Sequence, residues 1–293
     1  MDELNYLLKD IETEVIKTID DDKYSLDKIS TKEEIDNYLL LNAINNNPYA
    51  NNKEKEVMYE FLDFFNSNPY LDTKKVYSNL VNLKFIRNYN PFSNGISNYN
   101  NNDFIISASY HDNRITYYST PTKAIIGHEV AHAIFDTRSI PDAYVEGVAE
   151  IIENKYFKDE DEQDFGAYNK NVAITQATIE LIGKDKFLEA ISTDNISIIK
   201  DALVEVYSFN NNINKETATL YVDDLFKYLS NGLDDANVTK STAKLFESFY
   251  IKGTYDIGKL IRLVNYTSIL YYGPDEVNLP YYYFNEEKTL TKH

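Results

Sequence analysis

The 293-residue chain contains no cysteine and no tryptophan, and it has only four histidines, nine glycines and seven prolines. Without cysteine there can be no disulfide framework and no metal site built from thiolates. A transition-metal site in this protein must therefore use histidine, aspartate or glutamate. The lack of cysteine does not by itself select a cellular compartment.

Basic residues are also in deficit, since 29 lysines and arginines face 47 aspartates and glutamates, for a formal net charge of −18. Such a charge repels the phosphates of nucleic acids and anionic lipids, so we expect neither as a partner. No run of about 18 apolar residues is present, which excludes a membrane-spanning helix. The first residues lack a basic segment followed by an apolar one, so this sequence predicts no signal peptide. The compartment stays open between cytoplasm and secretion, and so does the oligomeric state.

The remaining composition is that of an ordinary globular protein, with 43% hydrophobic and 26% charged residues. Apolar residues recur every three to four positions through most of the chain, which predicts helices. Besides two that are discussed below, we expect helices at 2–19, 31–41, 53–66, 73–87, 163–182, 184–192, 195–207, 215–231, 237–251 and 256–272. The expected fold is α+β and mostly helical. It has an N-terminal helical region over 1–102, a central region over 103–160 and a C-terminal helical region over 161–293.

Residues 103–118 differ from the helical segments around them. Two β-prone runs, 104–110 and 114–118, flank a turn-like sequence at 111–113, so we expect a β-hairpin with a three-residue loop. His111 would then lie in an exposed turn, an interpretation that we prefer to a role as a metal ligand.

The most informative stretch is HEVAH at positions 128–132, inside an apolar run. With Ser119 or Thr120 as the cap and Pro121 at the first helical position, the stretch is predicted to lie on a helix. Residues four apart on a helix share a face, so both histidines can reach one metal ion. The alternative is a pair of buried histidines that other neighbours satisfy, with no metal.

A catalytic zinc site needs both metal ligands and a base. We expect His128 and His132 to bind Zn²⁺. Zinc with three protein ligands keeps a fourth position for water and lowers the pKa of that water to about 7. Glu129 can take the proton of the water as general base, and it is the predicted catalytic residue.

The third zinc ligand is expected on a helix predicted over 142–157. The three-histidine type of site is excluded, because the position six past His132 is Arg138. A carboxylate is the remaining choice, and we expect Glu146 to be the ligand. Glu150, four residues later on the same face, is predicted to hydrogen-bond a ligand histidine and orient it. The alternative is that both are solvated helix carboxylates.

HEVAH followed by EGVAE at 146–150 resembles the gluzincin metallopeptidases, in which HExxH precedes a helix that carries a glutamate ligand. The resemblance covers residues 104–156 and, more faintly, 168–190, where the chain looks like uncharacterised bacterial members. It implies a zincin-like core, a zinc ion and a peptide or protein substrate. It also implies a residue that stabilises the oxyanion, for which Tyr168 is a candidate, and a substrate-pairing edge strand, for which Arg114–Tyr118 is a candidate.

Three hypotheses follow for the function. The first is a zinc endopeptidase, which is favoured over an aminopeptidase because the GxMEN segment of gluzincin aminopeptidases is missing. The second is a zinc protein of the same fold that binds a peptide or protein without turnover, against which the intact Glu129 argues. The third is a helical interaction protein in which the motif is accidental.

Overall fold

The computed structural model describes residues 32–88, 107–157, 168–231, 236–249, 257–272, 282–284 and 290–292. The helix predicted over 2–19 lies outside them, as do the predicted region boundaries at 102 and 160, which stay predictions. Within the described part the fold is mostly helical with a small three-stranded sheet, so the coarse fold class is confirmed.

The described chain begins with the helices α2 (Lys32–Asn46), α3 (Asn52–Glu60), α4 (Leu62–Ser67) and α5 (Thr73–Asn82). A capping box starts α3, in which the Asn51 and Glu54 side chains each accept a hydrogen bond from the other's backbone. The single helix predicted over 53–66 is divided at Phe61. The Phe61 N–H bonds the carbonyl of Met58, three residues back, and this tighter turn interrupts the α-helical ladder.

The prediction of a helix over 73–87 is wrong at its C-terminal end. α5 stops at Asn82, and Lys84–Arg87 forms strand β1. The reason is tertiary, because β1 pairs in parallel with a later strand, β3 (Arg114–Tyr117), and this buries Phe85 opposite Ile115. Over so short an apolar run, periodicity does not distinguish the end of a helix from a strand.

The predicted β-hairpin is present, with β2 (Ala108–His111) antiparallel to β3. Its loop is shorter than expected, since only Asp112 and Asn113 lie between the strands, with φ of 46° and 58°. Two residues of positive φ form a type I′ turn, whose twist matches that of the strands and which Asp and Asn adopt readily. His111 therefore ends β2 opposite Arg114 instead of lying in the loop.

The strand order in this sheet is β1-β3-β2, so β3 is the central strand. The prediction that Arg114–Tyr118 is an edge strand is therefore wrong. The backbone of β3 is used on both sides, by β1 in parallel and by β2 in antiparallel pairing. In the described sheet the edges belong to β1 and β2.

The HEVAH stretch lies on α6 (Lys123–Phe135), as predicted. The helix starts later than expected, because Thr122 is the N-cap and its side chain accepts a hydrogen bond from the Ile125 N–H at 3.2 Å. Pro121 therefore precedes the cap. After a short connection the second predicted helix forms as α7 (Asp142–Tyr156).

The C-terminal part contains α8 (Asn169–Ile182), α9 (Lys184–Ser192), α10 (Ile196–Asn211), α11 (Lys215–Ser230), α12 (Ala236–Glu247) and α13 (Ile257–Tyr272). These helices agree with the predicted ones in number and order, although α10 runs to Asn211 instead of ending at 207. Two short strands, β4 (Tyr282–Phe284) and β5 (Leu290–Lys292), form a separate antiparallel pair.

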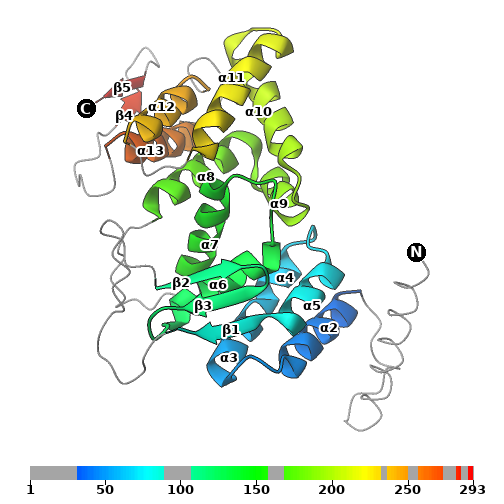
Figure 1. The fold of residues 1–293 in the computed structure, drawn as a ribbon. Helices are drawn as coiled ribbons and strands as arrows, with labels where there is room; N and C mark the ends of the chain where they lie inside the picture. The colour runs from blue at the N-terminus through cyan, green and yellow to red at the C-terminus, as the bar shows by residue number, and fades with distance from the viewer. Residues whose placement is uncertain are drawn as a thin grey trace.

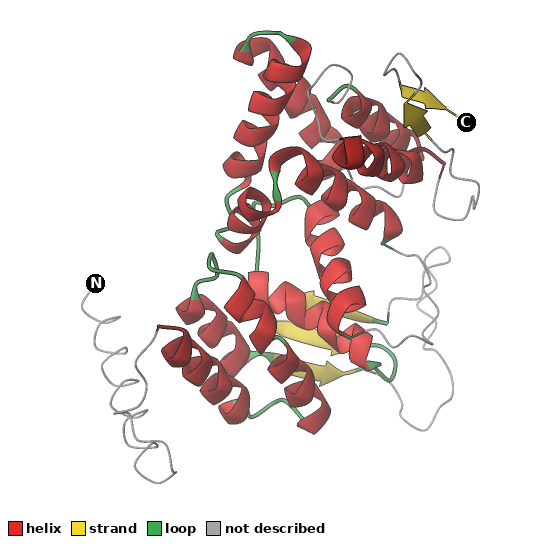
Figure 2. Ribbon diagram, turned by 180° about the vertical axis from the view of Figure 1, so that it is seen from behind, coloured by secondary structure: helices red, strands yellow, loops and turns green. Residues whose placement is uncertain are grey.

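Helix α7 joins two halves of the molecule. Figure 1 shows the sheet with α2–α6 in one half and α8–α13 in the other, and α7 runs between them. Seen from behind, the sheet lies against the bundle that contains α6 (Figure 2). Tyr144 of α7 packs on Phe187 of α9 and Phe226 of α11, whereas Phe157, directly after α7, packs on Phe61.

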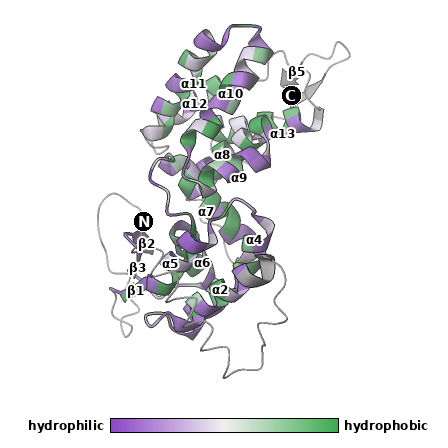
Figure 3. Cartoon of the chain, turned by 90° about the vertical axis from the view of Figure 1, so that its right-hand side faces the viewer, coloured by the Kyte–Doolittle hydropathy of each residue, from purple (hydrophilic) through white to green (hydrophobic). Residues whose placement is uncertain are grey.

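One buried hydrophobic cluster extends through both halves, from Leu40 on α2 to Leu270 on α13. Figure 3 shows hydrophilic and hydrophobic residues mixed along the helices, as amphipathic helices around such a core require. Among the described helices, none combines the length and the hydropathy needed to cross a bilayer.

Candidate metal centre

His128 and His132 share one face of α6, as their spacing predicts. Their ring centroids are 4.9 Å apart, with the planes inclined by 71°. His128 is buried, with 6% of its surface exposed. The preceding residue, Gly127, allows this depth, because a Cβ there would overlap the ring of Phe157. The helix therefore carries the first histidine into the interior at a point where a larger residue would not fit.

Glu146 on α7 reaches both imidazoles. One of its oxygens, Oε2, lies 3.1 Å from Nε2 of His128 and 3.4 Å from Nε2 of His132. A four-coordinate zinc ion with ligand distances of about 2.0–2.2 Å separates its ligand atoms by roughly 3.4 Å. Both nitrogen–oxygen distances are close to that separation, and the three ligand atoms all lie within 4.8 Å of one another. Two imidazoles and one carboxylate are a donor set that fits zinc.

The electrostatics of these groups couple them strongly. Burial by itself lowers the pKa of His128, but hydrogen bonds with Glu146 and Glu153 and the nearby carboxylates outweigh it and raise that pKa to about 10. Burial acts in the opposite direction on Glu146. Its hydrogen bonds with His128 and His132 prevail and hold its pKa well below the usual range. In the metal-free protein, His128 is therefore protonated at neutral pH.

Two further carboxylates lie on the other side of His128. Nδ1 of His128 is 2.9 Å from Oε2 of Glu153 and 3.6 Å from Oε2 of Glu150. Glu153 therefore makes the hydrogen bond that was predicted for Glu150, while Glu150 accepts one from Nδ2 of Asn154 at 3.1 Å. The sequence held a signal for Glu153, because spacings of four and then three place it on the same helical face as Glu146 and Glu150.

The carboxylate of Glu129 lies beside these groups but binds neither histidine. The residue is 7% exposed. Burial raises its pKa above the usual range, against the opposing effect of the nearby imidazoles of His132 and His128. A buried carboxylate with a raised pKa close to possible metal ligands has the properties of a general base.

Tyr168, which directly precedes α8, closes one side of the site. Its ring stacks on that of His128, with centroids 5.1 Å apart and an angle of 26°. Burial raises the pKa of its hydroxyl, and the surrounding carboxylates of Glu146, Glu129 and Glu150 raise it further. The hydroxyl therefore stays protonated and can donate a hydrogen bond.

Tyr110 of β2 covers His132 from the sheet. The two rings are nearly parallel, at 17°, with centroids 6.4 Å apart. The sequence carries no signal for this position of Tyr110, because only the packing of the hairpin against α6 brings it to the histidine. His111, its neighbour, stays away from the site, with 85% of its side chain exposed and Nδ1 3.1 Å from Asp112.

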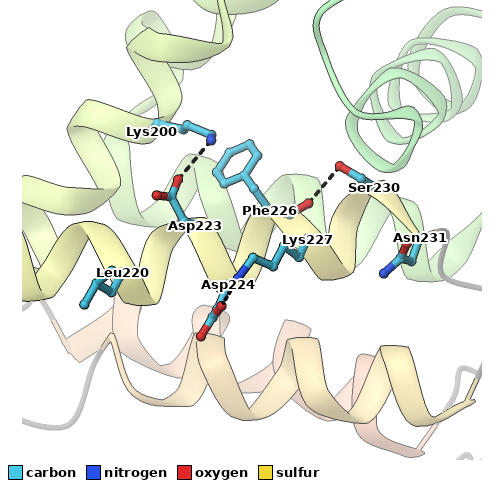
Figure 4. A pocket seen from close by; sticks show the side chains of 8 residues that line it. All are labelled: Lys200, Leu220, Asp223, Asp224, Phe226, Lys227, Ser230 and Asn231. Atoms are coloured by element: carbon cyan, nitrogen blue, oxygen red, sulfur yellow. Dashed lines mark hydrogen bonds and ion pairs between the residues drawn. The ribbon is translucent and has the colours of Figure 1, made fainter.

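A hollow lies elsewhere, on the surface of α10 and α11, with a volume of about 900 Å³. Figure 4 shows its charged side chains paired with one another, Lys200 with Asp223 and Lys227 with Asp224. Because these charges compensate each other, the hollow offers no convergent polar group for a charged ligand. Among the described residues, the histidines and glutamates that could bind a metal ion lie on α6 and α7.

Comparison with known proteins finds no match: no protein-family model, no curated protein and no solved structure is similar to this chain. The interpretation of the site therefore depends on its own geometry.

Proposed function

We propose that the protein is a zinc-dependent endopeptidase similar to the gluzincins, with His128, His132 and Glu146 as zinc ligands. The observation that carries this proposal is the convergence of the two Nε2 atoms on one oxygen of Glu146, at 3.1 and 3.4 Å. Residues brought together from two helices at metal-ligand spacing are not explained by the packing of a helical interaction protein.

The proposed roles follow from position and protonation. Zinc bound there would supply Lewis-acid chemistry, by polarising the scissile carbonyl and acidifying a water molecule. Glu129 takes the proton of the attacking water and transfers it to the leaving amine. Tyr168, protonated and next to His128, donates a hydrogen bond to the developing oxyanion. Glu153 accepts the Nδ1 proton of His128, which presents Nε2 to the metal.

The substrate strand is proposed to pair with β2. The Ser107 carbonyl accepts a hydrogen bond from the Tyr118 N–H at 2.9 Å, across the hairpin. Because hydrogen-bonded and non-hydrogen-bonded pairs alternate in antiparallel strands, the main-chain groups of Ala108 and Tyr110 face the free edge of β2. Tyr110 also contacts His132, so an extended peptide added at this edge would run past the metal ligands.

A second candidate function is a zinc protein of the same fold that binds peptide without turnover. The buried Glu129 favours hydrolysis, because a carboxylate that is not a ligand is expensive to bury and serves no purpose in a binding protein.

The test compares wild type with Glu129→Gln. Elemental analysis after reconstitution is expected to find about one zinc per chain in both proteins, since glutamine leaves the ligands in place. Cleavage of a broad peptide library is expected to fall by about 10²–10⁴-fold in the variant, because an amide cannot accept the proton. The melting temperature should stay unchanged.

Three other outcomes would contradict the proposal in different ways. A protein that takes up no zinc has no metal centre of this kind. Equal cleavage by wild type and Glu129→Gln excludes Glu129 as the base. Zinc in both proteins with no cleavage by either supports the binding protein instead.

A further inference from the structure

One edge residue of the sheet is linked to a proposed zinc ligand by two routes. The ring of Tyr110 lies against the imidazole of His132, in the offset and nearly parallel arrangement that aromatic pairs favour. The hydroxyl of Tyr110 donates a hydrogen bond to Oδ1 of Asp136 at 3.2 Å. Asp136 is in turn the C-cap of α6, and its N–H donates to the carbonyl of His132 at 2.8 Å.

These contacts form a closed path that begins and ends at His132. The route goes from the imidazole to the Tyr110 ring, through the hydroxyl to Asp136, and through the backbone back to His132. Both ends of this route therefore lie on His132, one at its side chain and one at its backbone carbonyl. Because the hydroxyl of Tyr110 is engaged with Asp136, we do not assign Tyr110 a role in stabilising the oxyanion.

Asp136 itself is held in place from α5. It has φ of 41° and ψ of 55°, in the left-handed region. Nζ of Lys75 donates to the carbonyls of Phe135 at 2.7 Å and of Asp136 at 3.2 Å. Nδ2 of Asn79 donates to the carbonyl of Ala133 at 2.9 Å. The end of α6 that carries the Asp136 carboxylate is therefore held in place by these hydrogen bonds. Asp136 can in turn restrain Tyr110 through the hydrogen bond with its hydroxyl.

We propose that Tyr110 is a positioning residue, which together with Asp136 fixes the imidazole of His132 in the orientation that metal binding requires. This inference deepens the proposed function and rests on it, since it concerns the same metal site. It assigns to His132 the kind of support that Glu153 gives to His128, but through an aromatic ring. Supporting groups of metal-binding histidines affect metal affinity by about 10–100-fold.

The experiment measures Co²⁺ and Zn²⁺ affinity by competition with a chelator, and the visible absorption spectrum of the Co²⁺ protein. Tyr110→Phe keeps the ring and removes the anchor, and Asp136→Gly removes the acceptor while glycine tolerates the left-handed backbone. Each variant should bind both ions about 10–100-fold more weakly, with an altered Co²⁺ spectrum. Both changes break the same hydrogen bond between Tyr110 and Asp136. The double variant should therefore bind metal no more weakly than the single variant with the lower affinity.

Two controls separate positioning from a general loss of stability. Asp136→Asn keeps both an acceptor oxygen and the tolerance of a left-handed conformation, so it should restore wild-type affinity and spectrum. Tyr118→Phe removes another hydroxyl of the same hairpin, 3.3 Å from Oγ of Ser109, and it should leave both unchanged.

Wild-type affinity and an unchanged spectrum in Tyr110→Phe and Asp136→Gly would overturn this inference and leave the proposed zinc site standing. A loss in Asp136→Asn equal to that in Asp136→Gly would overturn it too, because the acceptor would then be irrelevant. A wild-type protein that binds neither ion would overturn the zinc site itself, and this inference with it.

Discussion

His128 connects most of the charged groups of the proposed site. Its Nε2 faces Glu146, and its Nδ1 faces Glu153, with Glu150 farther away. A cation bound on the Nε2 side would compensate the negative charge of the three carboxylates around this buried imidazole. The carboxylates on the two sides then have different roles, one as a ligand and the others as supports.

Substitutions of the three glutamates should separate these roles. Glu146→Ala removes a proposed ligand and should lose most of the bound zinc. Glu153→Ala removes the acceptor for Nδ1 and should weaken zinc affinity by about 10–100-fold. Glu150→Ala should weaken it less, because Glu150 lies 3.6 Å from Nδ1. Chelator competition measures all three, and loss of metal in Glu150→Ala with retention in Glu146→Ala would reverse the assignment.

The raised pKa of His128 predicts how the stability of the metal-free protein depends on pH. The pKa is about 10 in the folded protein and 6.5 for an ordinary histidine. Stability from the charged imidazole is therefore fully present below about pH 6.5 and is lost as pH rises towards 10. Urea unfolding should give a smaller free energy of unfolding at about pH 9 than at about pH 7.

The matched variant is His128→Gln, which has no proton to lose. Its free energy of unfolding should vary less between the two pH values than that of wild type. An equal pH dependence in both proteins would show that other groups are responsible.

Among the elements, α7 must meet two requirements at once. It carries the three glutamates around His128, and it packs closely on α8. Gly147, next to Glu146, makes this approach possible. A Cβ at Gly147 would overlap Oγ1 of Thr175 and the backbone carbonyl of Asn171. Both residues belong to α8, so a side chain here would push the two helices apart.

Gly147→Ala should therefore destabilise the protein by about 1–3 kcal/mol, although alanine is the better helix former. Because displacement of α7 moves Glu146, zinc affinity should fall as well. Gly183→Ala is the control, since a Cβ there meets open space and strain comes only from its φ of 89°. It should lower the melting temperature without changing zinc affinity, whereas equal zinc affinity in both variants would exclude this role for α7 packing.

On the scale of the whole molecule, the connection between α6 and α7 is tied to the C-terminal helices through Asp194. Its Oδ1 accepts hydrogen bonds from the N–H groups of Arg138 at 3.0 Å and Ser139 at 2.9 Å. Oγ of Ser139 donates to the carbonyl of Asp194 at 2.6 Å. Asp194 lies in the turn before α10, so these bonds hold the proposed metal-binding half against the other half.

Asp194→Gly should lower the free energy of unfolding by about 1–2 kcal/mol, because the backbone N–H groups lose their acceptor. Glycine tolerates the φ of 50° at this position, so the loss reports the hydrogen bonds and not backbone strain. Asp194→Asn keeps an acceptor oxygen and should lie close to wild type. Urea denaturation measures both, and equal stability of the glycine and asparagine variants would deny the carboxylate this role.

Local sequence was sufficient for the features that depend on neighbours along the chain. Periodicity predicted α9 at its observed bounds, and the spacing of His128 and His132 placed both on one face of α6. The β-prone runs predicted the hairpin, because strand propensity and turn residues act over a few positions. The motif also singled out Glu146, whose carboxylate lies beside both histidines, and its role as a zinc ligand stays a prediction.

Tertiary structure decided the features that depend on distant segments. Lys84–Arg87 became a strand only because β3 pairs with it, and the same pairing moved the free edge from β3 to β2. The crossing of α6 and α7 selected Glu153 as the partner of His128, and the packing of β2 on α6 brought Tyr110 to His132. Periodicity reports which face of an element is buried, but not which residue of another element it meets there.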